Sequence, residues 1–158
     1  MKLIDKYQAS VHKQKVIDFW NHLHALPSGV NPEDRVKEVI YVAQNEEGQV
    51  IGVTTAVRNV VKKLNNSPMF LFRTLIHPTT RIPGLVDKLA VETKNYLQDQ
   101  YLAGKTDCIG IIAAIQNKQL MAAKPEAVWP STGLTFIGNN KDGSQIRVVY
   151  FEKAKISI

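Results

Sequence analysis

The stretch that decides the fold is "FLFRTLIHPTTRIPGLVDKLAVETKNYLQ", residues 70–98. It begins as an apolar run that stops at His77, and a short loop with Arg81 and Gly84 follows. From Leu85 onward, apolar side chains recur at helical spacing. We therefore predict a strand, a loop and a helix in that order. Such a corner can bind an anion at the start of its helix, or it can be an ordinary joint of an α/β protein.

Other runs of strand and helix character flank this corner on both sides. Before it we predict a strand at 2–7, a helix at 10–26 with Ser10 as its N-cap, and an antiparallel hairpin at 38–58. After it we predict a strand inside the sheet at 108–115, a short helix from 117, and a closing hairpin at 134–154. This order predicts an α/β sheet that is mainly antiparallel, with one parallel step through the helix that follows the corner.

Length and composition describe an ordinary globular chain. Its 158 residues, 44% hydrophobic and 22% charged, fit one domain over residues 1–158. The longest apolar run, residues 108–115, is too short to cross a bilayer, and the first ten residues contain no signal-peptide core. We therefore expect no membrane association and a cytoplasmic location.

The charge and the single cysteine limit the choice of partners. A net charge of +6 favours acidic partners such as a nucleotide cofactor, nucleic acid or an anionic assembly surface. The basic residues are dispersed along the sequence and are not interleaved with aromatic residues, so we rank nucleic-acid binding last. Cys108 is the only cysteine and opens an apolar run, so we expect it to be buried, with no disulfide and no metal site.

The corner and the order of elements together resemble the GNAT superfamily of acyl-CoA-dependent N-acyltransferases. That family has a strand ending V-x-P, two further residues, then Arg or Gln-x-x-Gly-x-Gly/Ala at the start of a helix. The matching segment here is "IHPTTRIPGLV", residues 76–86, and the resemblance covers nearly the whole chain. It implies a single-domain mixed sheet, mostly antiparallel and flanked by helices, whose central parallel strands splay apart.

The resemblance also implies where acetyl-CoA would bind as the acyl donor. The helix start and the loop before it would hold the pyrophosphate, because the first N–H groups of a helix lack internal partners. Other main-chain groups would pair with the pantetheine arm, and one asparagine beyond the next strand would face the cofactor. The residues implied for the cofactor are Leu75, Ile76, Arg81, Ile82, Gly84, Leu85, Val86 and Asn117.

This sequence departs from the family pattern at the places where chemistry is expected. Pro83 has no N–H to donate, and Val86 puts a branched side chain where the family has Gly or Ala. Trp129 stands where the family often has a tyrosine as general acid, and an indole is no practical proton donor. Arg73 lies where a glutamate base is common, and it suits either an anionic group of a substrate or a structural ion pair at the open edge of the sheet. We predict Arg73 and Trp129 as substrate contacts, and no catalytic residue is identified.

Two functions therefore remain open. The first is an acetyl-CoA-dependent N-acyltransferase that modifies a primary amine of a small molecule or a protein, without a metal. The alternative is a catalytically inactive GNAT-like fold, a pseudoenzyme that serves as a binding or assembly module. The sequence does not decide the acceptor, the acyl chain or the oligomeric state, so a homodimer stays open.

Overall fold

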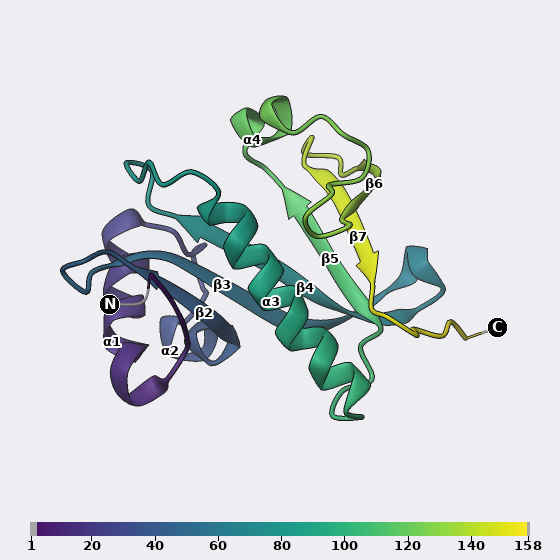
Figure 1. Ribbon diagram of the computed structural model, residues 1–158, viewed down its shortest axis with the longest axis horizontal. Helices are drawn as coiled ribbons and strands as arrows, with labels where there is room; N and C mark the ends of the chain where they lie inside the picture. Colours follow the sequence, from purple (N-terminus) through teal and green to yellow (C-terminus); the bar gives the residue numbers. More distant parts are fainter. Residues whose placement is uncertain (1–2, 158) are drawn as a thin grey trace. The chain divides into compact units, whose positions relative to one another are not determined.

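The computed structural model describes residues 3–157, and its helices and strands follow one another as the sequence predicts (Figure 1). The strands are β1 Ile4–Lys6, β2 Val39–Gln44, β3 Val50–Val61, β4 Ser67–Ile76, β5 Gly110–Ile115, β6 Thr135–Asn139 and β7 Gln145–Tyr150. The helices are α1 Ala9–Leu23, α2 Pro32–Arg35, α3 Leu85–Leu102 and α4 Lys118–Ala123, with 3₁₀ turns η1 Val36–Glu38 and η2 Lys62–Leu64.

The seven strands form one sheet in the order β1-β2-β3-β4-β5-β7-β6. The pairs β1–β2, β2–β3, β5–β7 and β6–β7 are antiparallel, whereas β4 and β5 are parallel from Phe70 opposite Ile111 to Phe72 opposite Ala113. The predicted mixed sheet with one parallel step through α3 is confirmed. The predicted splay of the parallel strands stays a prediction.

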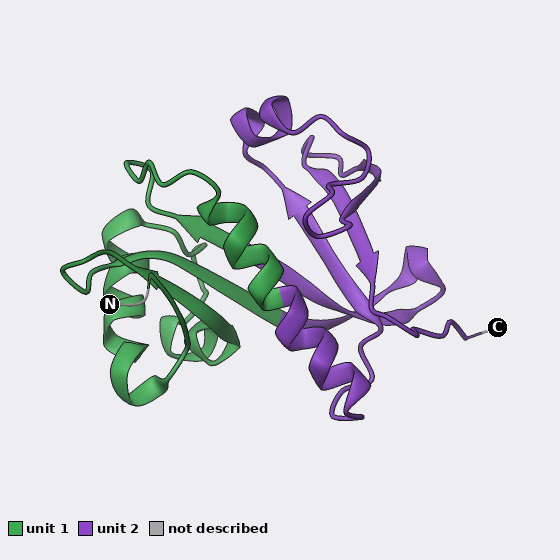
Figure 2. Cartoon of the chain, viewed as in Figure 1, with its two compact units in different colours: residues 1–56, 74–93 green, residues 57–73, 94–158 purple. Residues whose placement is uncertain are grey.

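The chain divides into two compact units, which are coloured separately in Figure 2. Unit 1 comprises residues 1–56 and 74–93, and unit 2 comprises residues 57–73 and 94–158. The elements β3, β4 and α3 each cross from one unit into the other along the chain. A single domain over residues 1–158 stays a prediction.

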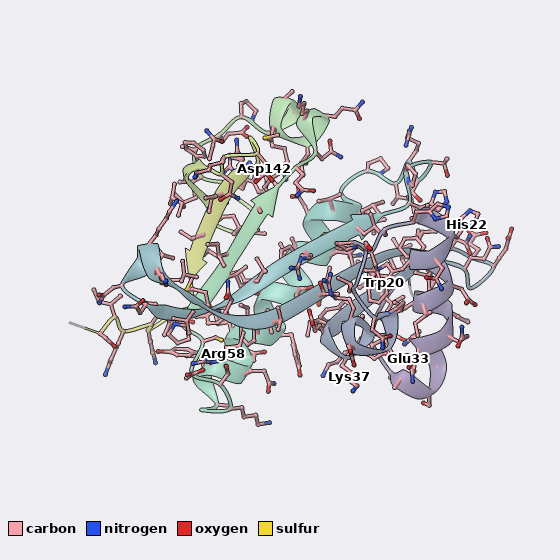
Figure 3. The ribbon with its side chains drawn as sticks, turned by 180° about the vertical axis from the view of Figure 1, so that it is seen from behind. Trp20, His22, Glu33, Lys37, Arg58 and Asp142 are labelled. Atoms are coloured by element: carbon pink, nitrogen blue, oxygen red, sulfur yellow. The ribbon has the colours of Figure 1, made fainter. Side chains whose placement is uncertain are left out.

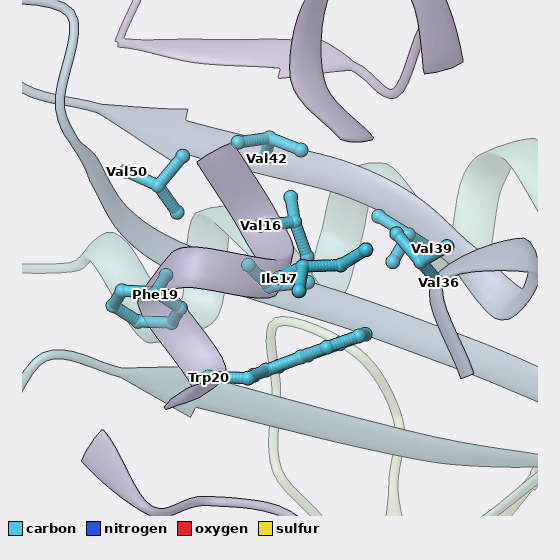
Figure 4. Packing of buried hydrophobic residues seen from close by; sticks show 9 residues of the cluster. Val16, Ile17, Phe19, Trp20, Val36, Val39, Val42 and Val50 are labelled. Atoms are coloured by element: carbon cyan, nitrogen blue, oxygen red, sulfur yellow. The ribbon is translucent and has the colours of Figure 1, made fainter. Parts of the chain in front are cut away.

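The larger core of unit 1 lies under α1 (Figure 4). Helix α1 contributes Val16, Ile17, Phe19 and Trp20, whose spacing places them on one side of the helix. They pack against valines of η1 and of strands β2 and β3, namely Val36, Val39, Val42, Val50 and Val53. Branched residues such as valine suit a pleated, half-buried sheet surface. The packing of α1 on this surface therefore explains the apolar residues of the helix and of the strands.

The start of α1 differs from the prediction. The helix begins at Ala9 with Gln8 as its N-cap, and Ser10 lies inside it, so the predicted cap was wrong. The reason is His12, whose fully buried ring accepts the N–H of Gln8 at Nδ1 over 2.9 Å. Because this imidazole makes a cap hydrogen bond from within the helix, no hydroxyl side chain is required at its start.

A second cluster in unit 1 fixes the first turns of α3. Leu85 and Leu89 of α3 pack against Ala43, and Ile51 and Ile76 lie against the same cluster. This packing holds the beginning of α3 against the strands, and it sets the position of the loop that precedes the helix.

Unit 2 has its own core around the β5–β7 pair. Its buried centre is Met69, Ile109 and Val148. The partly buried residues that pack against this centre are Val61, Leu64, Tyr101, Ile112 and Ala154. The C-terminal segment and the turn after β3 therefore share one hydrophobic cluster, which places them side by side (Figure 1).

Candidate functional site

The candidate site is the loop of residues 77–84, which connects β4 to α3 within unit 1. Its two ends are held by packing, because Ile76 at the end of β4 and Leu85 at the start of α3 belong to one cluster. His77 adds a main-chain hydrogen bond, donating its N–H to the carbonyl of Ile51 over 2.8 Å. The corner predicted from the sequence is therefore present, with both of its ends anchored.

Hydrogen bonds within the loop define its conformation. The N–H of Thr80 donates to the carbonyl of His77 over 2.9 Å, which closes a turn. The N–H of Thr79 donates to Nδ1 of His77 over 3.2 Å, and the Thr79 hydroxyl lies 2.9 Å from the same atom. The His77 ring is thus part of the turn, and the rings of Phe19 and His22 in α1 lie 6.4 Å from it between centroids.

Arg81 joins the loop to itself and remains exposed. Its Nη1 donates to the carbonyl of Pro78 over 2.7 Å and to that of Thr80 over 3.0 Å. These bonds hold the guanidinium at the loop, close to the start of α3. A guanidinium that is already held in place loses less conformational freedom when a phosphate binds than a mobile guanidinium would, so it binds the phosphate at a lower entropic cost.

The main chain at the start of α3 offers several N–H groups. Leu85 donates weakly to the carbonyl of Ile82 at 3.3 Å, and Lys88 donates to that of Gly84 at 2.9 Å. Among residues 3–157, the N–H groups of Ile82, Gly84 and Val86 make no hydrogen bond. Three such donors at the positive end of an 18-residue helix are able to donate hydrogen bonds to an anion, and we call residues 82–86 the cradle.

Gly84 keeps this cradle open. Its φ of +75° is a conformation that residues with a side chain rarely adopt, and a Cβ placed there would have no atom within 4 Å. The neighbouring Arg81, Ile82 and Pro83 are exposed, whereas Val86 is half-buried. A phosphate group can therefore approach the main chain at Gly84 from solvent.

Three other predicted cofactor residues, Leu75, Ile76 and Asn117, make contacts within the protein. Leu75 packs against the cluster under α1, while Ile76, its neighbour on β4, packs against the cluster with α3. Asn117, in unit 2, is the N-cap of α4, and its Oδ1 accepts the N–H of Leu120 over 3.0 Å. The roles of all three toward a cofactor stay predictions.

The two predicted substrate residues lie in unit 2 and differ in exposure. Arg73 is an exposed residue of β4. Trp129 is 5% exposed, and its indole N–H donates to the carbonyl of Lys124 over 2.9 Å. The Lys124 ammonium lies 5.0 Å from the centroid of the Trp129 ring. The N–H proton of this indole is thus already engaged, and a role for either residue toward a substrate stays a prediction.

Arg147 on β7 is a buried charged residue beside Trp129 that the sequence pattern did not reveal. Its guanidinium carbon lies 4.0 Å from the centroid of the Trp129 ring, and its side chain is 1% exposed. Burial lowers the pKa of this guanidinium, although an arginine remains protonated in a protein. The available signal was a charged residue in the middle of the otherwise apolar strand "IRVVY".

Cys108 is a buried thiol, as the sequence predicts. It is fully buried, and burial raises the pKa of its side chain, so less of the nucleophilic thiolate is present at neutral pH. We expect the folded chain to react with a disulfide reagent such as DTNB at least roughly tenfold more slowly than the chain in 8 M urea. Equal rates in the two conditions would contradict burial, and absorbance of the released thiolate measures both.

Comparisons with known proteins identify the fold. No protein-family model matches the chain, and no curated protein matches it. Among solved structures, a GNAT-family acetyltransferase from Streptococcus pneumoniae is 12% identical with a TM-score of 0.65, over 95% of this chain and 99% of that one. Ribosomal-protein-S5-alanine acetyltransferase from Vibrio fischeri is 11% identical with a TM-score of 0.63, over 99% and 97%.

A third similar structure is a complex with acetyl-CoA. It is phosphinothricin acetyltransferase from Sinorhizobium meliloti in complex with acetyl-CoA, 12% identical with a TM-score of 0.63, over 96% of this chain and 89% of that one. The chain therefore has the GNAT fold, as its element order predicts. Within residues 3–157, no helix is both long and apolar enough to cross a membrane.

Proposed function

We propose that this chain is an acetyl-CoA-dependent N-acyltransferase whose donor binds at the loop before α3. The observation that carries the proposal is the set of unpartnered N–H groups of Ile82, Gly84 and Val86, at an open glycine in a chain with the GNAT fold. A pyrophosphate would accept hydrogen bonds from these groups and from Leu85, with Arg81 supplying charge. Pro83 lies between two of these donors, so its missing N–H removes one contact and leaves the others in place.

The reaction requires little acid or base chemistry from the protein. The acceptor nitrogen forms a bond to the thioester carbonyl carbon, the carbon–sulfur bond breaks, and the proton of the amine passes to solvent. A thiol has a pKa of about 8.5, so its thiolate can leave without a general acid. A main-chain N–H at the end of β4, near Ile76, would stabilise the negative oxygen that develops during attack. Without a positioned acid or base the rate should be roughly 10²- to 10⁴-fold below that of an enzyme that has one.

Calorimetric titration with CoA and acetyl-CoA tests the proposal. We expect a single site for both ligands, each competing with the other, because the cradle contacts the part that they share. Absence of heat together with absence of competition would remove the donor assignment. Formation of free thiol in the presence of a panel of primary amines then tests transfer itself.

A matched pair of variants locates the binding site. Gly84→Asp places a carboxylate over the cradle, where like charges a few ångströms apart should weaken CoA binding by about tenfold or more. Gly104→Asp is the control, because Gly104 has a φ of +74° and a Cβ added there would also have no atom within 4 Å. Both variants carry the same charge and the same backbone demand, so equal losses of affinity would show that the cradle is not the site.

One observation favours the inactive binding module as a second candidate. Trp129 occupies the position where the family often has its acid, and its indole N–H is taken by the carbonyl of Lys124. A chain of this kind could bind CoA without turnover. Binding of CoA with no thiol release above the uncatalysed rate, across the amine panel, would favour the module, whereas turnover with any amine would exclude it.

A further inference from the structure

The net positive charge of this protein belongs to one of its two units. Unit 2 contains twelve lysine and arginine residues against five aspartate and glutamate residues, a net charge of +7. Unit 1 contains eight against nine, a net charge of −1. The overall value of +6 therefore conceals an uneven distribution, because unit 2 has four more basic and four fewer acidic residues than unit 1.

Several of these basic residues meet at one end of unit 2. The turn after β3 and the C-terminal segment share a cluster through Leu64 and Ala154, and the side chain of Asn65 donates to the carbonyl of Ser157. Figures 1 and 3 both show these two segments side by side. The basic end, as we call it, consists of Arg58, Lys62, Lys63, Lys153 and Lys155, together with Lys105, whose loop is joined to Arg58 through Asp107.

Few carboxylates neutralise the basic end. Arg58 is paired with Asp107 through two hydrogen bonds of 2.9 and 2.8 Å, which also ties the loop before β5 to β3 (Figure 3). The five lysines are exposed, and within residues 3–157 none of them forms an ion pair. In segments 58–66, 103–107 and 152–157, which carry the basic end, Glu152 is the one acidic residue besides Asp107. The basic end therefore presents five solvent-exposed ammonium groups, and within the described part of the chain only its arginine is paired with a carboxylate.

One of these lysines has an unfavourable backbone conformation. Lys153 has a φ of +63°, in the left-handed region that disfavours residues with a Cβ, and Ala154 after it donates its N–H to the carbonyl of Phe151. A glycine would fit this turn with less strain. The turn nevertheless presents a lysine, so this charge stands at a position where the fold alone favours a different residue.

We infer that the basic end binds the phosphate backbone of duplex nucleic acid. Lysine-rich surfaces without aromatic residues are poor protein–protein interfaces, whose centres favour Tyr, Trp and Arg and are depleted of Lys. Segments 58–66, 103–107 and 152–157 contain no aromatic residue, so the segments that carry the lysines supply no ring on which unpaired bases could stack. What remains is contact between ammonium groups and phosphates, which positions a duplex without reading its sequence.

The folded arrangement of the lysines revises the low rank that the sequence suggested for nucleic acid. Linear spacing hid the surface, because its lysines come from three segments that only the fold brings together. The lysines of the basic end are different residues from those proposed to hold CoA, so duplex binding and CoA binding can be measured separately.

The test is fluorescence anisotropy of the full chain with labelled 20-base-pair DNA and RNA duplexes of mixed sequence. We expect binding whose log K falls with log salt with a slope of roughly −3 to −5, which is about a 60- to 1,000-fold loss between 50 and 200 mM salt. DNA and RNA should both bind, because backbone charge is what they share. A flat salt dependence or no binding at 50 mM salt would overturn the inference.

Two double variants distinguish binding at the basic end from a general effect of net charge. The variant Lys63→Gln with Lys155→Gln should weaken binding at least tenfold at low salt and lower the slope by about 2. The control, Lys15→Gln with Lys37→Gln, removes the same charge from exposed positions of unit 1 and should change affinity less than twofold. Equal losses in the two variants would mean that net charge, and not the basic end, is responsible.

Two further arms exclude unfolding and other anionic partners. Lys153→Gly removes one charge and relieves the left-handed residue, so it should bind duplex more weakly while melting at or above the wild-type temperature. Polyglutamate and phosphatidylserine vesicles are the other anions tested. Tighter binding to either than to the duplexes, compared at equal salt, would overturn the assignment to nucleic acid.

Discussion

The variant Gly110→Ala is expected to lose about 4 kcal/mol or more of unfolding free energy, which is an exceptional cost for one methyl group. Gly110 lies on β5 opposite Tyr150 of β7. A Cβ at this position would lie 2.3 Å from the carbonyl oxygen of Val149, 2.9 Å from Cε of Met69 and 3.0 Å from Cα of Tyr150. Two of these atoms belong to the main chain of β7, so the overlap cannot be relieved by a side-chain rotation. At about 2–4 °C per kcal/mol, the melting temperature should fall by roughly 8–16 °C.

Two comparison variants distinguish this main-chain overlap from ordinary crowding. At Gly52 in unit 1 a Cβ would meet the ends of two side chains, Ile76 at 2.9 Å and Leu89 at 3.2 Å, which can move, so Gly52→Ala should cost about 1–3 kcal/mol. Ala114→Ser adds one atom at an exposed position of β5 and should change stability by about 0.5 kcal/mol or less. Urea unfolding followed by circular dichroism measures all three. A Gly110→Ala cost no larger than that of Gly52→Ala would contradict the close approach of β7.

Local pattern predicted the elements of this fold well. The helical spacing of Val16, Phe19 and Trp20 and the hairpin with its tight turn depend on residues close together in sequence. The structure confirms the helix and the antiparallel pair β2–β3. The parallel step also followed from the sequence, because a strand, a helix and a second strand in succession leave few other connections. The prediction of Ser10 as the N-cap of α1 was wrong. The helix begins at Ala9, and the buried ring of His12 accepts the N–H of Gln8 at its start.

The candidate site was predicted only where it is local in sequence. The loop with Arg81 and Gly84 lies within eight residues, so its motif is readable along the chain. The contacts of Arg147 are not readable in this way, because they reach 13 to 21 residues back to main-chain carbonyls that carry no residue-specific signal. The lysines of the basic end present the same difficulty, since charges distant in sequence become neighbours only after the chain has folded.

Loss of the Arg147 guanidinium is expected to have the second large effect on stability. Nη1 donates to the carbonyls of Ala127 at 3.1 Å and Leu134 at 3.2 Å, and Nη2 donates to that of Glu126 at 2.9 Å. Arg147→Met keeps an apolar stem of similar shape but removes these three charge-assisted hydrogen bonds. The carbonyls of Ala127 and Leu134 keep their main-chain donors, the N–H groups of Phe136 at 2.8 Å and Trp129 at 3.0 Å. A hydrogen bond to a charged group contributes about 1.5–3 kcal/mol, so loss of these bonds is expected to cost about 3–5 kcal/mol.

Arg58→Met is the matched control, because it removes an arginine of the same unit that also makes a paired hydrogen bond. The Arg58 side chain is 53% exposed and its partner Asp107 is 61% exposed, so its loss should cost about 1 kcal/mol or less. Hydrogen exchange adds a local readout, since Arg147→Met should accelerate exchange in residues 124–135 more than elsewhere in the core of unit 2. That segment contains Trp129, the residue that stands where the GNAT resemblance places an acid, and the Arg147 guanidinium lies over its ring. Equal costs for the two variants, with unchanged exchange in this segment, would mean that the buried guanidinium does not hold the Trp129 segment in place.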